Sequence, residues 1–179
     1  MNVEEKINQG STSGGVTSTG TVNSLTSLAQ GTNYTDRIGN SIKLQRIEVR
    51  MKAIMNSSST GTLLRVILFR DLYQSGTAPG VTDVLNQNGS STAPLQPYNW
   101  LLRDRIAIIY DEIVSLSGTG DNTAALNIDV PHSGHVKYVG TTSGAASNGP
   151  GSVYLLLVSD EATNTPTVTY AYRVTFTDD

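Results

Sequence analysis

One stretch of the chain alternates between a set of apolar residues and a set of mostly charged residues: Ile47-Glu48-Val49-Arg50-Met51-Lys52-Ala53-Ile54-Met55. In a β-strand, successive side chains point to opposite faces of the sheet. The odd-numbered residues of this stretch would therefore share an apolar face, and the even-numbered residues would share a charged face. The stretch predicts a half-buried strand that begins near Ile42.

Other segments show the same strand signal, either by alternation or as short apolar runs between turn residues. They cover residues 63–69, 106–111, 126–130, 135–139, 153–158 and 167–176, and residues 22–28 could supply a short first strand or an anchor. Residues 82–86 fit a single helical turn with Thr82 as its N-cap. About eight strands with long connections predict an all-β, two-sheet sandwich, of which the eight-stranded jelly-roll β-sandwich is the commonest form.

The composition supports a single, mostly β domain. The chain has 179 residues, of which 37% are hydrophobic and 15% are charged. It contains no cysteine, which excludes disulfides, thiolate metal sites and a cysteine nucleophile. We find no secretory signal near the start and no apolar run long enough to cross a bilayer. We therefore expect a protein that is made inside the host cell, is not secreted by a signal peptide and contacts no membrane.

Residues 1–20 form a polar segment, in which residues 11–20 are nearly all Ser, Thr and Gly. Such a segment buries too little apolar surface to offset the entropy lost on ordering. We predict a flexible polar N-terminal arm over residues 1–20, mobile or held by neighbouring molecules. The jelly-roll domain would then span residues 21–179.

Several ordered segments carry a resemblance to a known family. They are Gln30-Gly31, Asp36-Arg37-Ile38-Gly39-Asn40-Ser41-Ile42-Lys43, Val66-Ile67-Leu68-Phe69-Arg70-Asp71, Gly76-Thr77-Ala78-Pro79, Val81-Thr82-Asp83-Val84-Leu85-Asn86 and Ala145-Ala146-Ser147-Asn148-Gly149-Pro150-Gly151. Their order and spacing resemble coat proteins of the satellite tobacco necrosis virus type, including the related capsids of small circular single-stranded DNA viruses. The similarity runs from about residue 21 to the end of the chain. It implies a single jelly roll and a capsid protein of the virion. It also implies self-assembly as a homo-oligomer of sixty copies in a T=1 icosahedral shell.

The resemblance also implies a calcium site at the subunit interfaces. The match carries its ligands over to the backbone carbonyls of Ile38 and Ser41 and to the carboxylate of Asp178. Calcium takes oxygen ligands, and carbonyls combined with a carboxylate from another subunit would suit it. The alternative is that Asp178 is a solvated residue near the end of the chain.

Arg46, Arg50 and Lys52 are the candidates for binding nucleic acid, because they occupy even-numbered positions on one strand. On the inner face of a shell, such a row would neutralise phosphates. The alternative is an ordinary solvated face, or a network of ion pairs between subunits. Related coat proteins carry an Arg- and Lys-rich N-terminal arm, whereas residues 1–20 contain one lysine and two glutamates. With a net charge of −3 per chain as well, we expect binding of viral nucleic acid to be weak or absent.

The sequence gives no support for an enzyme. Its two histidines lie in Pro131-His132-Ser133-Gly134-His135, which we interpret as a polar turn between two strands. A zinc site needs three or four converging ligands, so two histidines are too few. The classes that remain are structural proteins and binding modules.

Aromatic residues on loops and strand ends suggest contacts with other molecules. Tyr73, Tyr98 and Trp100 are candidates for contacts between subunits, where aromatic residues carry much of the binding free energy. For Trp100, the alternative is a half-buried packing role within one subunit. The alternative function of the whole chain is a carbohydrate- or receptor-binding jelly-roll module, and the sequence identifies no host receptor.

Overall fold

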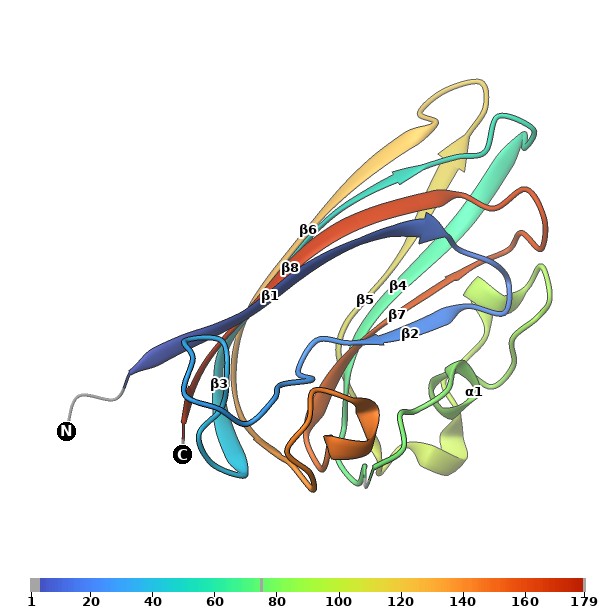
Figure 1. The fold of residues 1–179 in the computed structure, drawn as a ribbon. Helices are drawn as coiled ribbons and strands as arrows, with labels where there is room; N and C mark the ends of the chain where they lie inside the picture. The colour runs from blue at the N-terminus through green and yellow to red at the C-terminus, as the bar shows by residue number, and fades with distance from the viewer. Residues whose placement is uncertain (1–3, 75, 179) are drawn as a thin grey trace.

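The computed structural model describes residues 4–74 and 76–178, and its two antiparallel β-sheets lie face to face (Figure 1). The eight strands are β1 (Glu5–Gly15), β2 (Thr21–Ser24), β3 (Ser41–Ile54), β4 (Gly61–Asp71), β5 (Ile106–Ser117), β6 (Thr123–Lys137), β7 (Ser152–Ser159) and β8 (Thr167–Asp178). The helical elements of the described residues are α1 (Val81–Val84) and three 3₁₀ turns, η1 (Ala93–Leu95), η2 (Trp100–Leu102) and η3 (Ala145–Ser147). None of these helices is long and apolar enough to cross a membrane.

The strand order identifies the architecture. One sheet has the order β1-β8-β3-β6 and the other has the order β2-β7-β4-β5. The chain therefore crosses from one sheet to the other at every connection except the one between β4 and β5. Two four-stranded sheets linked in this way form a jelly roll. The predicted all-β, eight-stranded jelly roll is confirmed.

β3 is an inner strand of the first sheet, and its alternation follows the prediction. It pairs with β6 on one side and with β8 on the other. Ile47, Val49, Met51 and Ala53 point into the sandwich and are at most 4% exposed. Burial of a side chain as large as those of Ile47, Val49 and Met51 contributes about 1.5–3 kcal/mol to stability. The outward residues between them remain accessible to solvent.

The central strands of the second sheet are buried on both faces. Every residue of β7 is buried, although the inner face alone packs against the first sheet. The connection between β4 and β5 covers the outer face, where Val81, Val84 and Leu85 pack on Ile67 and Phe69. The helical turn predicted at residues 82–86 is α1. Gly80, rather than Thr82, precedes this helix and donates its N–H to Asp83 Oδ2 at 2.9 Å.

The prediction of a flexible arm over residues 1–20 is wrong for residues 5–15, which form β1. This edge strand pairs with β8 along its whole length, from Glu5 opposite Thr177 to Gly15 opposite Thr167. Backbone hydrogen bonding to β8 orders a segment whose own side chains bury little apolar surface. A Cβ at Gly10 would lie 2.9 Å from the Tyr172 ring, so glycine here lets that ring pack against the backbone of β1.

The predicted polar turn at Pro131–His135 is also wrong, because the two strands predicted on either side of it are one strand, β6. Inward and outward residues alternate through this segment without interruption. β6 is an edge strand, which tolerates the missing N–H of proline better than an inner strand does. Pro131 also lies opposite Arg46, where the pairing with β3 shifts at a β-bulge.

His132 and Arg70 meet on the inner side of β6. The Arg70 guanidinium comes from β4 in the opposite sheet and donates to the backbone oxygens of His135, at 2.6 Å, and Gly151, at 3.1 Å. Gly134 has no side chain to occupy this space. Burial lowers the pKa of His132, and the positive charge of Arg70 lowers it further. The buried Nε2 of His132 has no hydrogen-bond partner among the described residues. This environment favours the neutral form of the ring, because a protonated Nε2 would be a buried donor without an acceptor.

Acidification should destabilise the fold in part through His132. Because its pKa in the folded state lies below the ordinary value of about 6.5, the unfolded chain takes up this proton first as the pH falls. We expect the thermal unfolding temperature, followed by circular dichroism, to decrease as the pH is lowered from about 7 to about 5. In His132→Gln the fall should be shallower. A variant with the same pH dependence as the wild type would contradict this role.

Candidate functional site

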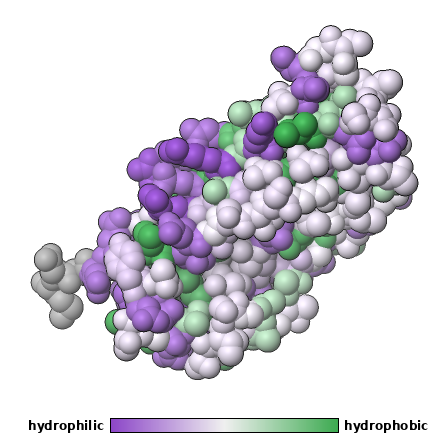
Figure 2. All heavy atoms as spheres, turned by 45° about the horizontal axis from the view of Figure 1, so that its top comes forward, coloured by the Kyte–Doolittle hydropathy of each residue, from purple (hydrophilic) through white to green (hydrophobic). Residues whose placement is uncertain are grey.

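The outer face of the β1-β8-β3-β6 sheet carries a concentration of positive charge. Pairing with β3 brings Arg173 of β8 beside Glu48, and Glu48 beside Asp129 of β6. Among residues 4–74 and 76–178, the face holds six basic and three acidic residues, a net charge of +3: Lys43, Arg46, Arg50, Lys52, Lys137 and Arg173 against Glu5, Glu48 and Asp129. The rest of the chain then has six basic and twelve acidic residues. Figure 2 shows strongly hydrophilic residues gathered along this flank of the molecule.

The three predicted nucleic-acid-binding residues, Arg46, Arg50 and Lys52, lie together on this face and are all exposed. Arg46 is engaged with Asp129 through two hydrogen bonds of 2.7 Å and 2.5 Å. These bonds hold the pKa of the Asp129 carboxyl below its ordinary value. Arg50 and Lys52 form no ion pair with any described residue. They are therefore better placed than Arg46 to meet an external anion.

Arg173 belongs to the same face and was not among the predicted site residues. A hollow of about 640 Å³ opens on this face, and Arg173 lines it together with Gln9, Ser11, Glu48 and Arg50. Its size is within the range of small-ligand sites. The sequence marks Arg173 as an outward residue of a strand. That it lies near Arg50 could not be predicted, because this depends on which strand pairs with β8.

The predicted calcium ligands lie near one another at one end of the sandwich. Asp178 pairs with Ile42, the neighbour of Ser41, in the ladder between β3 and β8. The backbone N–H of Ile38, rather than its carbonyl, faces the carboxylate and donates to Asp178 Oδ1 at 2.9 Å. The Asp178 side chain is only 22% exposed. The alternative of a solvated terminal residue therefore does not describe it.

The second oxygen of the Asp178 carboxylate is already paired with a cationic side chain of the protein. The ammonium of Lys6, in β1, lies 2.8 Å from Asp178 Oδ2. The carbonyl of Ile38 accepts a hydrogen bond of 2.6 Å from Gln30 Nε2. Calcium needs six to eight oxygen ligands, and the described residues contain no cluster of three or more His, Cys, Asp or Glu. Calcium binding stays an untested prediction, but the donors around Asp178 do not fit that ion.

The two histidines do not form a metal pair either. In β6, His132 points inward and His135 points outward, since they are three residues apart on one strand. They therefore lie on opposite faces of the sheet.

A second candidate surface is apolar and lies on the connection between β4 and β5. Its most exposed large side chains are Leu101 at 87%, Trp100 at 72%, Tyr73 at 67% and Leu95 at 59%. The alternative of a half-buried packing role for Trp100 is therefore wrong. The Arg103 guanidinium lies over this indole, 4.4 Å from the centre of the Trp100 ring. Exposed apolar groups of this size are typical of protein–protein interfaces.

Tyr98, which was also predicted to contact another subunit, is largely engaged within its own. Its hydroxyl donates to Asp111, and the Arg65 guanidinium lies 5.2 Å from its ring. Arg65 in turn pairs with Asp111 at 2.6 Å. Tyr98 is 42% exposed, less than Trp100 or Tyr73. We therefore assign Tyr98 mainly to holding the connection in place.

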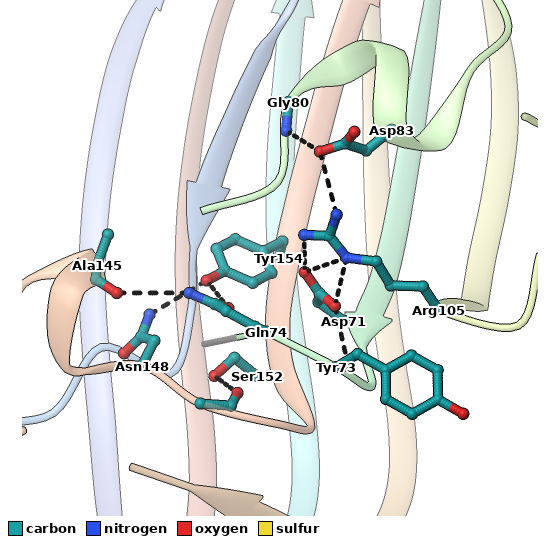
Figure 3. Close-up of polar contacts among 11 residues, drawn as sticks. Asp71, Tyr73, Gln74, Gly80, Asp83, Arg105, Ala145, Asn148, Ser152 and Tyr154 are labelled. Atoms are coloured by element: carbon teal, nitrogen blue, oxygen red, sulfur yellow. Dashed lines mark hydrogen bonds and ion pairs between the residues drawn. The ribbon is translucent and has the colours of Figure 1, made fainter. Parts of the chain in front are cut away.

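Polar contacts fix both ends of this connection to the sheet (Figure 3). Asp71, at the end of β4, is fully buried and accepts hydrogen bonds from Arg105, just before β5, at 2.9 Å and 2.6 Å. Arg105 also lies 3.7 Å from Asp83 in α1. Nearby, the Tyr154 hydroxyl donates to Gln74. A surface held in this way loses less conformational entropy when it docks.

Comparisons with known proteins match this chain to a family. The sequence matches the family described as Satellite tobacco necrosis virus coat protein over residues 3–179, which includes β1. It is 33% identical over 157 residues to the capsid protein of Satellite tobacco necrosis virus 1, covering 86% of this chain and 75% of that protein. It is 29% identical over 168 residues to the coat protein of Maize white line mosaic Satellite virus, covering 91% and 75%.

Among solved structures, the chain is similar to Desmodium yellow mottle tymovirus with a TM-score of 0.43 and 7% identity, covering 99% of this chain and 90% of that chain. It is similar to the Israel acute paralysis virus pentamer with a TM-score of 0.42 and 10% identity, covering 99% and 68%. The fold assignment rests on the strand order instead. The chain belongs to the satellite tobacco necrosis virus coat protein family, and it is a structural protein of a viral capsid rather than an enzyme.

Proposed function

We propose that this coat protein assembles into a T=1 icosahedral shell of sixty copies, with the outer face of the β1-β8-β3-β6 sheet turned toward the interior. The main support for this orientation is that positive charge is concentrated on this face of an otherwise negative chain. The face has a net charge of +3, whereas the whole chain has a net charge of −3. A positive lining inside a negative subunit suits a container for a polyanion.

Contact with the viral nucleic acid would be weak, dependent on salt and independent of base sequence. Arg50, Lys52 and Arg173 would meet phosphates, since cations on a sheet face can neutralise phosphates without reading bases. The expectation of weak or absent binding rested partly on the lack of an Arg- and Lys-rich N-terminal arm, since residues 1–20 contain one lysine and two glutamates. Residues 5–15 form β1 rather than an arm, but the lack of basic residues remains, because the single lysine of this segment, Lys6, is buried. The net charge of −3 still opposes tight packaging.

Contacts between subunits would use the apolar surface of the connection between β4 and β5. Trp100 and Leu101 lie side by side in η2 and are the strongest candidates for anchors there. An anchor residue at a protein interface commonly contributes 2 kcal/mol or more to binding. The alternative of a carbohydrate- or receptor-binding module has no such support from the family match. We expect assembly to occur inside the host cell.

Purified protein should form uniform hollow particles in negative-stain electron microscopy, and it should sediment as one large species in analytical ultracentrifugation. Closed symmetric assembly limits the product to a single size. A stable monomer or dimer under all buffer conditions would contradict the assembly proposal. The carbohydrate- or receptor-binding alternative would then become the leading function.

Arg50→Gln should weaken binding of a fluorescent single-stranded oligonucleotide to subunits, measured by anisotropy. The plot of log affinity against log salt should become shallower by about 0.7, the value for one lost phosphate contact on a single strand. Glu48→Gln, on the same face, should tighten binding because it removes a negative charge. Arg103→Gln, on the connection between β4 and β5, serves as the control. An equal effect of Arg50→Gln and Arg103→Gln would contradict an interface on the sheet.

Trp100→Ser and Leu101→Ser should block or weaken assembly without lowering the unfolding midpoint of the subunit, because both side chains are already exposed. If each contact is worth about 2 kcal/mol, the concentration needed for assembly should rise at least about tenfold. Trp100→Phe and Leu101→Met keep apolar volume and are the matched controls. Normal assembly of both serine variants would exclude this surface as the contact.

A further inference from the structure

A buried lysine ammonium occupies the end of the sandwich where β1, β8 and the loop before β3 meet. Lys6 is 3% exposed, although it belongs to an edge strand of polar residues. Its Nζ lies 2.8 Å from Asp178 Oδ2 and donates to the backbone oxygen of Asp36 at 3.0 Å. A buried ammonium is costly unless it is paired and hydrogen-bonded, and both conditions are met here.

The Asp178 carboxylate is completed by groups of the same subunit. Oδ1 accepts the backbone N–H of Ile38 at 2.9 Å, and Oδ2 faces Lys6. Arg37 is fully buried beside this site, and the negative charge of Asp178 acts on the pKa of its guanidinium, which burial lowers overall. Arg37 donates to the carbonyls of Leu28 and Gly39 and packs 4.1 Å from the centre of the Tyr138 ring. Asp178 therefore has two protein cations near it.

A divalent cation at this carboxylate would be repelled by positive charges of the protein and would not find free oxygen ligands. It would have to displace the Lys6 ammonium or sit close to it, and Arg37 adds a second positive charge nearby. Displacement would leave the ammonium buried without its partner, which is strongly unfavourable. The groups at this end of the sandwich already supply the positive charge that a bound metal would bring.

We propose that Lys6 takes the place of a divalent cation at Asp178, so that the carboxylate ties β1 to β8 within one subunit and the shell closes without calcium at this position. The part of the inference that concerns the shell rests on the proposed assembly. The pairing of Lys6 with Asp178 can be measured on the isolated subunit. The claim about the shell and the claim about the Lys6–Asp178 pair can therefore be disproved separately.

The first test compares wild-type particles in EDTA and in calcium chloride by the temperature at which they dissociate, followed by light scattering. We expect the two temperatures to agree. A cation bound at about a hundred times its dissociation constant would raise the midpoint by about 5–10 °C. A loss of that size in EDTA, restored by calcium, would overturn the proposal. Absence of particles would instead count against the proposed assembly and leave the subunit test decisive.

The second test is a double-mutant cycle on the subunit with Lys6→Met, Asp178→Asn and both together, in EDTA. Asp178→Asn should lower the unfolding midpoint most, because it leaves the ammonium buried and unpaired. The double variant should be more stable than Asp178→Asn alone. If the single variant does not fold, recovery of folded protein in the double variant is the readout. Additive effects, or a double variant no more stable than Asp178→Asn, would overturn the pairing.

Lys52→Met is the matched control. It makes the same substitution on the outer face of the first sheet, where the lysine is exposed and has no ion pair among the described residues. Its unfolding midpoint should equal that of the wild type, with or without calcium. A loss in Lys52→Met as large as in Lys6→Met would show that the effect comes from overall charge and not from the buried pair.

Discussion

The pairing of β3 with β6 on one side and with β8 on the other is the interaction on which the rest of the structure depends. It fixes the register of the sheet, and register decides which side chains enter the core. A slip of one residue would turn Ile47, Val49 and Met51 outward and bury the charged residues between them. The same pairing therefore sets both the hydrophobic core and the positive outer face. The core and the charged face of this sheet therefore have one structural origin.

Segments whose own side chains alternate or are strongly apolar could be predicted from the sequence. β3, β4, β7 and β8 all fall where the pattern placed them. β1 could not be predicted in this way, because its order comes from backbone pairing with a strand more than 150 residues further along the chain. The tendency of Ser, Thr and Gly to stay disordered is a local property, and a distant partner overrides it.

The single long strand β6 was missed for a related reason. Pro131 and Gly134 are strong turn residues in an isolated peptide. In the sheet, Pro131 lies at a bulge on an edge strand, and the missing side chain of Gly134 makes room for Arg70. Both residues are accommodated in the strand by tertiary contacts that cannot be predicted from the local sequence.

The candidate site was predictable in composition but not in arrangement. Arg46, Arg50 and Lys52 do share an exposed face, as their spacing on one strand requires. The neutralisation of Arg46 by Asp129 and the addition of Arg173 depend on strand order. Lys6 could not be linked to Asp178 while residues 1–20 were interpreted as an arm.

The pair of Lys6 and Asp178 has a consequence for how such a particle could open. A shell closed by bound calcium can respond to a change in the calcium concentration around it, because mass action removes the ion. A subunit that carries its own cation on a covalently attached side chain has no free ligand to lose. For this coat protein, the signal that releases the contents would then have to act elsewhere, on the contacts between subunits.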